Sequence, residues 1–287
     1  MKIKKRDPDF KNTLIFALIL LVALETFFLV RNRLPKALVQ KRPVTIERPL
    51  EARKKTIHPK IAIIIDDWGY NAQHCQILKE IGYPLTISIL PNLPHSDTIA
   101  QCAHDSHKDV ILHLPLEPYE SHEEYPKNYV INTDMSQEEI QNILGDALKS
   151  VSFAVGISNH MGSKATEDPA LMKTIFADLK KKNLYFVDSL VTSQSVGQST
   201  SRVFDLPFVS RDVFLDNEND QDYITNQLAQ LTRIAQKRGY AIGIGHDRRL
   251  TLNVLKEQME LLTREGFEFV TVTQLLKTKA SYEHSRN

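Results

Sequence analysis

Two adjacent carboxylates follow directly on a long apolar run early in the globular part of this chain. Residues 61–65 read IAIII, and they are followed by Asp66 and Asp67 and, after Trp68, by Gly69. Side chains of a regular strand alternate between its two faces, so both carboxylates can serve one site only if the strand has already ended. Aspartate and neutral histidine are ligands of divalent ions such as zinc. The pair therefore predicts a split role, in which one carboxylate binds a metal ion and the other accepts a proton from water.

Four later apolar runs also end in polar residues that suit a metal site. His113 stands in VILHLPLEP, Asn159 and His160 in VGISNHMGS, Asp188 in LYFVDS, and His246 in AIGIGHD. The carboxyl ends of parallel strands meet at one edge of a sheet, where α/β proteins place their chemistry. We expect these side chains to meet at one rim, around a zinc ion with about three protein ligands and an open position for water. Such a water has a pKa of about 7 and is a usable nucleophile.

Short apolar runs alternate with helical patterns from Lys60 onward, and this alternation positions those residues. The runs are mostly continuous, which is typical of parallel strands covered on both faces. Ser136 with Glu139 predicts a capping box, Asp168 before a proline predicts a helix start, and Gly239 predicts a helix end. The predicted fold is α/β, a single irregular β/α barrel with mostly parallel strands, although the order of elements does not distinguish a closed barrel from an open sheet. The candidate strands are residues 61–65, 85–90, 109–114, 154–158, 184–187, 213–215, 240–244 and 267–272, and the candidate helices are 72–81, 96–103, 136–150, 169–182, 220–237 and 252–264.

The N-terminal segment differs from the rest in composition. A basic flank at residues 1–12 precedes the apolar run TLIFALILLVALETFFLV at residues 13–30, which is about long enough to cross a bilayer as a helix. We expect a retained single-pass membrane anchor; the alternative is a cleaved signal segment that releases the protein into the periplasm. Both interpretations place the folded part outside the cytoplasm. The remaining predicted segments are a basic, proline-containing linker at 31–59, the barrel at 60–278 and a disordered tail at 279–287.

The bulk composition is that of an ordinary globular protein. The chain has 287 residues, of which 42% are hydrophobic and 25% charged. Its formal net charge of +1 argues against bulk electrostatic binding, and we expect no nucleic-acid partner. Cys75 and Cys102 are too few for a disulfide framework. They are able to pair in an oxidising compartment, but we favour two buried thiols on neighbouring helices.

Six segments within about residues 61–251 read, in order, IIIDDWGYN, HLPLEP, SNHMGS, FVDS, RDVFLD and GIGHDRRLT. Taken together, they give the chain a resemblance to the divergent polysaccharide deacetylases, a distant branch of the polysaccharide deacetylases. Polysaccharide deacetylases hydrolyse N-acetyl or O-acetyl groups on sugars with zinc or a similar ion, on an irregular β/α barrel. The resemblance implies that Asp66 is the base, Asp67 a metal ligand and His246 the acid that protonates the leaving group.

The chain departs from the family pattern at three places. The paired metal-ligand histidines usually stand close together as H-x-x-x-H, whereas His113 and His160 belong to different strands. The arginine motif is missing in its usual form, and Arg211 in RDVFLD is the candidate to hold Asp66 ionised. Proline is expected after the late histidine, and Asp247 stands there instead.

Five further residues are candidates for supporting or substrate-binding roles. Asp188 either orients a histidine or caps the next segment. Asn159 either donates to a developing oxyanion or stabilises a turn. Arg211 either holds Asp66 ionised or forms a surface ion pair. Trp68, together with Tyr70, either lines a sugar site or packs over the mouth of the barrel. Glu117 is either a functional group or only a rim charge. The histidines at positions 58, 74, 95, 104, 107, 122 and 284 are interpreted as surface residues.

Together these features predict a metal-dependent hydrolase that deacetylates a cell-envelope carbohydrate by attack of a metal-bound water. The predicted catalytic residues are Asp66 and His246, and the predicted ligands of a divalent ion, zinc by preference, are Asp67, His113 and His160. A catalytically inactive glycan-binding or scaffold module is the alternative, which the missing H-x-x-x-H spacing favours; a hydrolase of some other ester is a third. The expected partners are a carbohydrate and, through the N-terminal helix, the membrane.

Overall fold

The computed structural model describes residues 8–33, 58–120 and 129–284 of the chain. Two compact units are distinguished, residues 1–55 and 56–287. The described part of the first unit is one helix, α1 (Pro8–Arg33). In α1 the side chains of Ile15 and of residues 17–31 are described. Among the described residues of the chain, no helix is long and apolar enough to cross a membrane. Most of the predicted linker lies outside the described residues.

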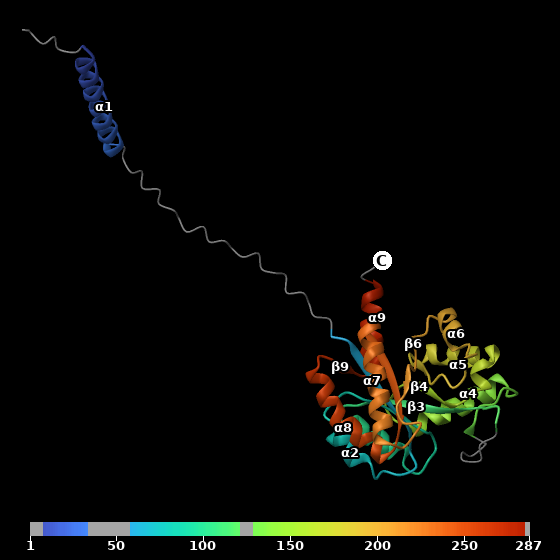
Figure 1. Cartoon of the computed structure of the whole chain (residues 1–287). Helices are drawn as coiled ribbons and strands as arrows, with labels where there is room; N and C mark the ends of the chain where they lie inside the picture. Colours follow the sequence, from blue (N-terminus) through green and yellow to red (C-terminus); the bar gives the residue numbers. More distant parts are fainter. Residues whose placement is uncertain (1–7, 34–57, 121–128, 285–287) are drawn as a thin grey trace, which may run out of the picture. The chain divides into compact units, whose positions relative to one another are not determined.

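The second unit is built on one sheet, nine-stranded over the described residues, in which all pairings are parallel (Figure 1). The strands are β1 (Lys60–Trp68), β2 (Thr86–Ile89), β3 (Asp109–Leu116), β4 (Ala154–Met161), β5 (Tyr185–Asp188), β6 (Phe208–Ser210), β7 (Val213–Phe214), β8 (Tyr240–His246) and β9 (Glu268–Val270). Their order is β6-β5-β4-β3-β2-β1-β8-β7, with β9 also paired to β1. The two end strands, β6 and β7, are separated in the chain only by Arg211 and Asp212. A connection of two residues can join the two end strands only if these strands lie close together, so the sheet must be curled. The predicted α/β fold with parallel strands is confirmed, as a curled half-barrel.

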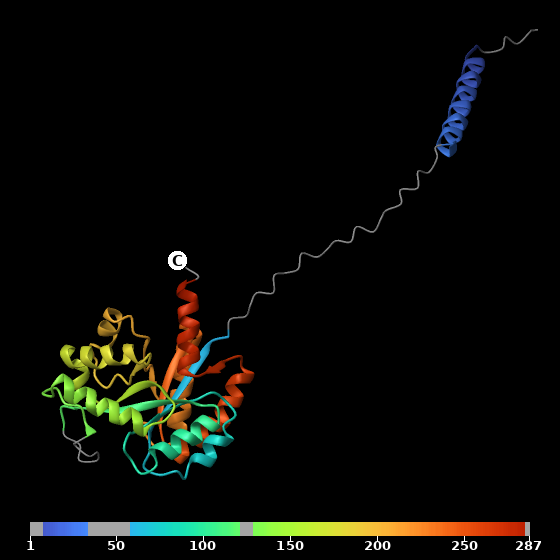
Figure 2. The ribbon, with the colours of Figure 1, turned by 180° about the vertical axis from the view of Figure 1, so that it is seen from behind.

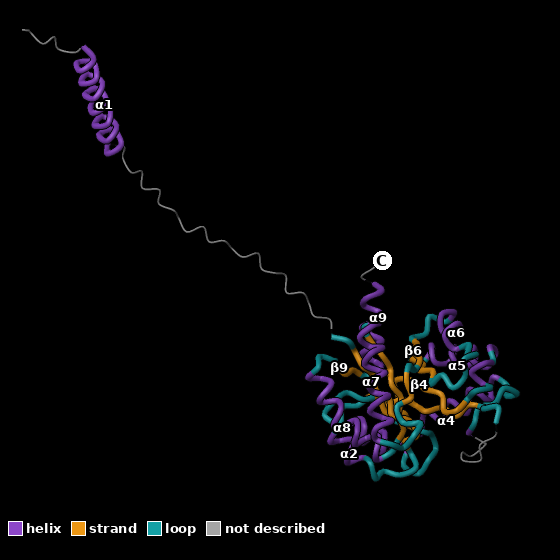
Figure 3. The backbone as a smooth tube through the Cα atoms, in the orientation of Figure 1, coloured by secondary structure: helices purple, strands orange, loops and turns teal. Residues whose placement is uncertain are grey.

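Helices surround the strands, as the views in Figures 2 and 3 show. They are α2 (Cys75–Glu80), α3 (Ser96–Asp105), α4 (Gln137–Ser150), the short 3-10 helix η2 (Ala165–Glu167), α5 (Pro169–Lys181), α6 (Gly197–Val203), α7 (Gln221–Arg238), α8 (Arg249–Arg264) and α9 (Val272–His284). The sequence did not predict α6, α9 or β6. α6 and β6 are too short for a periodic pattern to be recognised. α9 runs past residue 278, where the domain was predicted to end.

Local signals in the sequence set the ends of several helices as predicted. The backbone N–H of Ser136 donates to Glu139 Oε2 at 2.8 Å, and that of Glu139 donates to Ser136 Oγ at 3.3 Å, which completes the capping box of α4. Asp168 accepts from two backbone N–H groups in the first turn of α5. α7 ends at Gly239, whose φ of 90° is readily adopted only by glycine. Each such N-cap contributes about 1 kcal/mol.

Alternation along the strands divides the apolar core into two layers. In β1, Ile63 and Ile65 belong to the layer between sheet and helices, whereas Ala62 and Ile64 belong to an inner layer within the curl of the sheet. The first turns of α9 also pack in that inner layer. Asp66 is the next residue after Ala62 and Ile64 on the inner face of β1. The alternation therefore directs its carboxylate into the concave side of the curled sheet, near the carboxyl end of the strand.

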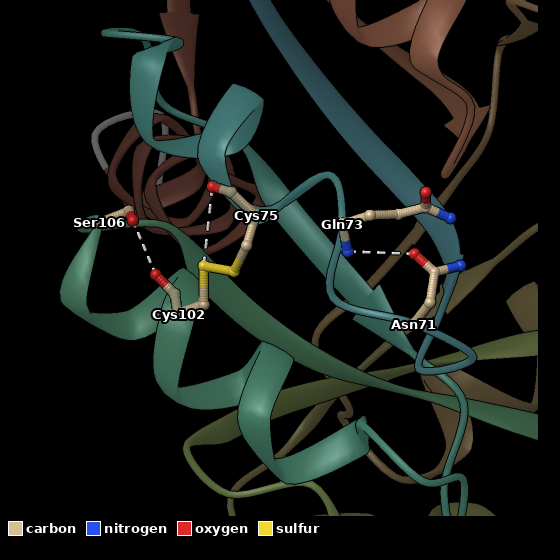
Figure 4. Close-up of a disulfide and its surroundings, with 5 residues drawn as sticks. All are labelled: Asn71, Gln73, Cys75, Cys102 and Ser106. Carbon is tan, nitrogen blue, oxygen red and sulfur yellow. Dashed lines mark hydrogen bonds between the residues drawn. A yellow bond between two sulfur atoms is a disulfide. The ribbon is translucent and has the colours of Figure 1, made fainter.

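A disulfide joins Cys75 and Cys102, so the favoured interpretation of two free thiols is wrong (Figure 4). The neighbouring helices were expected: Cys75 begins α2 and Cys102 lies in α3. The bridge links two helices that are separated in the chain by β2.

Candidate metal centre and active site

A bulge near the end of β1 explains how two adjacent carboxylates serve one site. β1 continues to Trp68, and its pairing with β2 shifts register between Ile65 and Trp68. Asp67 has a φ of 65°, in the left-handed region that aspartate tolerates better than most residues. A bulge breaks the alternation and re-aims a side chain. The expectation that the strand ends before the second carboxylate is therefore wrong, because the bulge brings Asp67 to the side that Asp66 faces.

Asp67, His113 and His160 bring their ligand atoms within 4.8 Å of one another. Asp67 Oδ1 lies 3.3 Å from Nε2 of His113 and 3.1 Å from Nδ1 of His160, and the two ring nitrogens are 3.2 Å apart. Within the described part of the chain, this buried oxygen has no hydrogen-bond partner. Three atoms at such spacings leave points roughly 2.1 Å from each, the distance at which zinc binds nitrogen and oxygen. The donor set and the orphaned oxygen both fit a divalent cation.

The register of the sheet brings the two histidines together although they are far apart in sequence. β3 and β4 are neighbours, and their pairing sets His113 opposite Ser158 and Pro115 opposite His160. The two imidazoles meet edge to face, with ring centroids 4.9 Å apart. His113 is buried and His160 is partly exposed. Two neighbouring strands thus bring together a pair of histidines that the sequence pattern H-x-x-x-H would have supplied from one short segment.

The two carboxylates of β1 differ in their affinity for a proton. Burial raises the pKa of Asp66, the neighbouring charge of Asp67 adds to this, and the nearby histidines and the Ser88 hydroxyl oppose it. Burial also acts on Asp67, but the imidazoles of His113 and His160 outweigh it and hold the pKa of Asp67 well below its usual value. Two carboxyl groups whose pKa values are pushed apart suit different roles. Asp67 stays ionised to hold a cation, while Asp66 is the stronger base.

His246 lies beside Asp66, and a second aspartate holds it there. Asp66 and His246 are directly paired residues of β1 and β8. Nδ1 of His246 lies 2.7 Å from Oδ1 of the fully buried Asp216, whose Oδ2 accepts from the backbone N–H of His246 at 2.9 Å and from Thr251 Oγ1 at 2.7 Å. Burial lowers the pKa of His246, but Asp216, followed by Asp67 and Asp66, raises it overall. With Nδ1 engaged by Asp216, Nε2 is the nitrogen available to a substrate.

Sequence reasoning missed Asp216 and misjudged His74. Asp216 directly follows the apolar run at residues 213–215, so the rule that found the other strand-end residues would have found it too. His74 was interpreted as a surface residue, but its Nδ1 lies 2.7 Å from Asp247 Oδ1 and its side chain is 16% exposed. Burial raises the pKa of Asp247, and His74 opposes that shift. The aspartate that replaces the expected proline therefore has a specific partner.

Two buried serines inside the strands also belong to the site. Ser158 Oγ lies 2.8 Å from Nδ1 of His113 and 2.7 Å from Ser88 Oγ. The Ser88 hydroxyl in turn stabilises the ionised form of Asp66. No sequence pattern singles out one serine within an apolar strand, so only the fold reveals these two.

Arg211 does not hold Asp66 ionised, contrary to the hypothesis drawn from the sequence. Its Nε and Nη2 donate to two backbone carbonyls of the loop after β5, at 2.7 and 2.9 Å. Its guanidinium carbon lies 3.7 Å from the centroid of the Phe214 ring, which stacks on the imidazole of His246 with centroids 5.9 Å apart. Arg211 therefore packs against Phe214, the aromatic ring on which His246 stacks.

Asp188 and Asn159 are buried and bind backbone and loop groups. Asp188 accepts from the backbone N–H of Leu190 at 2.8 Å and from the Ser195 hydroxyl at 2.6 Å, so it caps the segment after β5 and does not orient a histidine. The Asn159 side chain accepts from the backbone N–H of Ser189 at 2.8 Å and donates to a backbone carbonyl of its own strand. Of the alternatives left open by the sequence, capping and turn stabilisation fit these contacts.

Trp68 and Glu117 are engaged within the protein. Trp68 is fully buried in the layer between sheet and helices, so the hypothesis that it lines a sugar site is wrong. Tyr70, which is 48% exposed, is the aromatic residue accessible at this end of β1. Glu117 pairs with Lys164 at 2.6 Å and accepts from the backbone N–H of Thr133 at 2.8 Å. These contacts join loops at the rim.

Comparisons with known proteins agree with the fold. The sequence model of the divergent polysaccharide deacetylase family matches residues 63–276. Uncharacterized protein YibQ of Escherichia coli strain K12 is 33% identical over 200 residues, which are 70% of this chain and 62% of that protein, so the match spans less than two thirds of its length. An uncharacterized protein of Haemophilus influenzae Rd is 30% identical over 206 residues, 72% of this chain and 73% of that one. The crystal structure of uncharacterized protein ATU2773 from Agrobacterium tumefaciens C58 has a TM-score of 0.71 at 20% identity, over 76% of this chain and 89% of that one, which shows a shared fold.

Proposed function

The chain belongs to the divergent polysaccharide deacetylase family, and from this premise we propose that it is a metal-dependent hydrolase that removes acetyl groups from a cell-envelope carbohydrate. The observation that carries the proposal is the convergence of Asp67, His113 and His160 beside the buried carboxylate of Asp66. Such a cluster has the donors of a catalytic zinc site and a neighbouring base.

The chain's own side chains divide the work of hydrolysis. Asp67, His113 and His160 would hold the divalent ion, for which we propose zinc because two imidazoles and a carboxylate suit it. When bound, the ion lowers the pKa of water and polarises the acetyl carbonyl. Asp66, a stronger base because burial raises its pKa, accepts the proton from the attacking water.

His246 supplies the acid for the second half of the reaction. Its pKa is raised by Asp216, so the ring holds a proton to higher pH. Asp216 fixes Nδ1, and Nε2 donates its proton to the departing amine or alcohol. Because Asp66 and His246 are paired residues of neighbouring strands, base and acid flank the same point of the rim.

The geometry weakens the alternative of a catalytically inactive glycan-binding module. That alternative drew its support from the missing H-x-x-x-H spacing. His113 and His160 nevertheless meet, with ring nitrogens 3.2 Å apart, so the spacing no longer argues against a metal site.

Acetate release tests the proposed activity. The full chain, loaded with Zn²⁺ or Co²⁺, is incubated with N-acetylated and O-acetylated glycans, and acetate is measured. We expect release by the wild type and by Asp97→Asn, a control at an exposed residue of α3, and a loss on the order of 10²–10⁴-fold in Asp66→Asn. Release no greater than that of Asp66→Asn would count against the proposal.

We also propose that the domain acts outside the cytoplasm, on the periplasmic side, tethered through residues 13–30. Disulfides such as Cys75–Cys102 form and persist in oxidising compartments. The large apolar side chains described in α1, among them Phe27 and Phe28, are exposed, and an apolar surface of that kind needs a partner such as lipid. A carbohydrate of the cell envelope would then be within reach of the site.

A further inference from the structure

Three polar side chains form one hydrogen-bonded row inside the curl of the sheet. His113 Nδ1 lies 2.8 Å from Ser158 Oγ, and Ser158 Oγ lies 2.7 Å from Ser88 Oγ. The Ser88 hydroxyl also lowers the pKa of Asp66, against the effect of burial. The row therefore leads from a candidate metal ligand through two buried hydroxyl groups toward the proposed base.

The curl of the sheet makes this row possible. Ser158 is paired with His113 across β3 and β4, whereas Ser88 lies on β2, on the other side of β3. Side chains of β2 and β4 meet over β3 because they point into the concave side, where strands two places apart converge. Both serines are fully buried, and their small side chains leave room for this contact.

The hydrogen atoms of the row have only one arrangement that is compatible with a bound cation. To bind a cation, His113 needs the lone pair of Nε2, so its ring hydrogen is on Nδ1, which donates to Ser158. The hydroxyl of Ser158 has one hydrogen and donates it to Ser88, which donates its own to Asp66. The carboxylate of Asp66 accepts this hydrogen, so each hydrogen of the row has one acceptor.

The reverse arrangement removes the metal site. If Ser158 donates to Nδ1 of His113, the ring hydrogen moves to Nε2 and occupies the place that a cation needs. Ser88 opposes this reversal, because its oxygen accepts the hydrogen of Ser158 when its own hydrogen is directed toward Asp66. The orientation of the Ser88 hydroxyl therefore sets the direction of the row and, through Ser158, the tautomer of His113.

We propose that Ser158 and Ser88 are positioning residues that select the cation-binding tautomer of His113 and couple it to the carboxylate of Asp66. The inference rests on the proposed metal site and adds two residues to it. Neither serine touches the cation or the substrate; both act through His113, as partners of metal-ligating histidines do in other proteins.

Binding of Zn²⁺ alone tests this inference without relying on activity. Titration calorimetry is carried out on the full chain and on Ser158→Ala, Ser88→Ala and the double variant. We expect Ser158→Ala to lose about 10–100-fold in affinity, the usual cost of removing a partner of a ligating histidine. Ser88→Ala is expected to lose about tenfold, the lower end of that range, because it frees the Ser158 hydroxyl to turn toward His113. The double variant should be no weaker than Ser158→Ala, because the row acts as one unit.

Two further measurements separate positioning from a structural role. Ser201→Ala is the matched control, since Ser201 is a buried serine whose hydroxyl donates to a carbonyl of its own helix, Gln198 O. The visible spectrum of bound Co²⁺ should change in Ser158→Ala and remain unchanged in Ser201→Ala. The melting temperature without metal shows whether each variant folds; if Ser158→Ala does not fold, the affinity of Ser88→Ala decides.

The outcomes distinguish this inference from the proposed function. If Ser158→Ala and Ser88→Ala bind Zn²⁺ as tightly as the wild type, the positioning role is overturned while the metal site stands. If the two losses add in the double variant, the coupling through Ser88 is overturned. If the wild type binds Zn²⁺ no better than Asp67→Asn, the metal site fails, and this inference fails with it.

Discussion

Individual contacts give chemically similar side chains of the site different properties. Asp66 and Asp67 are neighbours in sequence, yet burial raises the pKa of one and two imidazoles hold that of the other low. Burial lowers the pKa of His246, but the carboxylate of Asp216, at 2.7 Å, together with Asp67 and Asp66 raises it overall. Each property depends on one or two partners, so single substitutions should separate them.

The pH dependence of activity should depend on Asp216. A general acid acts while protonated, so kcat/KM falls as the pH rises through the pKa of His246. Burial lowers that pKa and the charge of Asp216 raises it, with Asp67 and Asp66 adding to the effect. In Asp216→Asn the raising charge is lost, so the alkaline fall in kcat/KM is expected to move to lower pH.

The control is Asp212→Asn, which alters a carboxylate that pairs with Arg238 and accepts from a backbone N–H of β8. The wild-type profile should be kept in this variant. An alkaline limb at the same pH in wild type and Asp216→Asn would show that His246 is not the acid or that Asp216 does not set its pKa.

At the scale of elements, a single irregularity in β1 creates the metal site. Regular alternation would send Asp66 and Asp67 to opposite faces, and the bulge with Asp67 at a φ of 65° brings both to one side. The register between β3 and β4 then supplies His113 and His160. A non-glycine residue in the left-handed region costs roughly 1–2 kcal/mol, so β1 is less stable than a regular strand would be.

Substitution of Asp67 should reveal this backbone strain. Both Asp67→Gly and Asp67→Ala remove the carboxylate, but glycine adopts a positive φ without steric cost. The glycine variant is expected to be more stable than the alanine variant by about 1 kcal/mol in urea unfolding of the metal-free chain.

At Lys60, in the same strand and without a positive φ, the order should reverse, with alanine more stable than glycine by about 0.5–1 kcal/mol. Equal stability of the two Asp67 variants would contradict the strained bulge.

At the scale of the whole molecule, the disulfide and the N-terminal segment both bear on the compartment in which the domain acts. A bridge between α2 and α3 is compatible with the oxidising compartment that we propose for the domain, and residues 13–30 were predicted to take the domain there. Neither the compartment nor the anchor follows from the fold of the second unit, so both need a test on the full chain.

Labelling of cysteines in cells tests the location. We expect the full chain in the membrane fraction, with Cys75 and Cys102 unreactive to a maleimide added on unfolding until a reductant is present. A chain without residues 1–30 should stay in the cytoplasm and be labelled at both positions, and Cys102→Ala should leave Cys75 reactive. Labelling of both cysteines in the full chain without reductant would place the domain in a reducing compartment.

Much of the architecture could be predicted from the sequence because it depends on residues close together in the chain. Apolar runs such as residues 61–65 and 240–244 indicated buried parallel strands, and Ser136, Asp168 and Gly239 indicated helix ends that the structure has. The short elements α6 and β6 were missed because a few residues show no period.

Part of the candidate site was also accessible from the sequence. A polar residue at or near the end of an apolar run is a local feature, so the sequence alone singles out Asp66, Asp67, His113, His160 and His246. Asp216 obeys the same rule. The number and type of these aspartates and histidines are enough, from the sequence alone, to predict a metal site at the rim of a parallel sheet.

Only the tertiary structure decided which of these side chains meet. The bulge at Asp67, the contact of Ser88 with Ser158 across β3 and the stacking of Phe214 on His246 depend on strand register and on the curl of the sheet. Register and curl are set by packing among residues distant in sequence, and a shift of one residue turns every side chain of a strand to the other face. For this reason the sequence left two alternatives open for Trp68 and for Arg211, and only the structure shows that Trp68 lies in the core and that Arg211 packs on Phe214, beside His246.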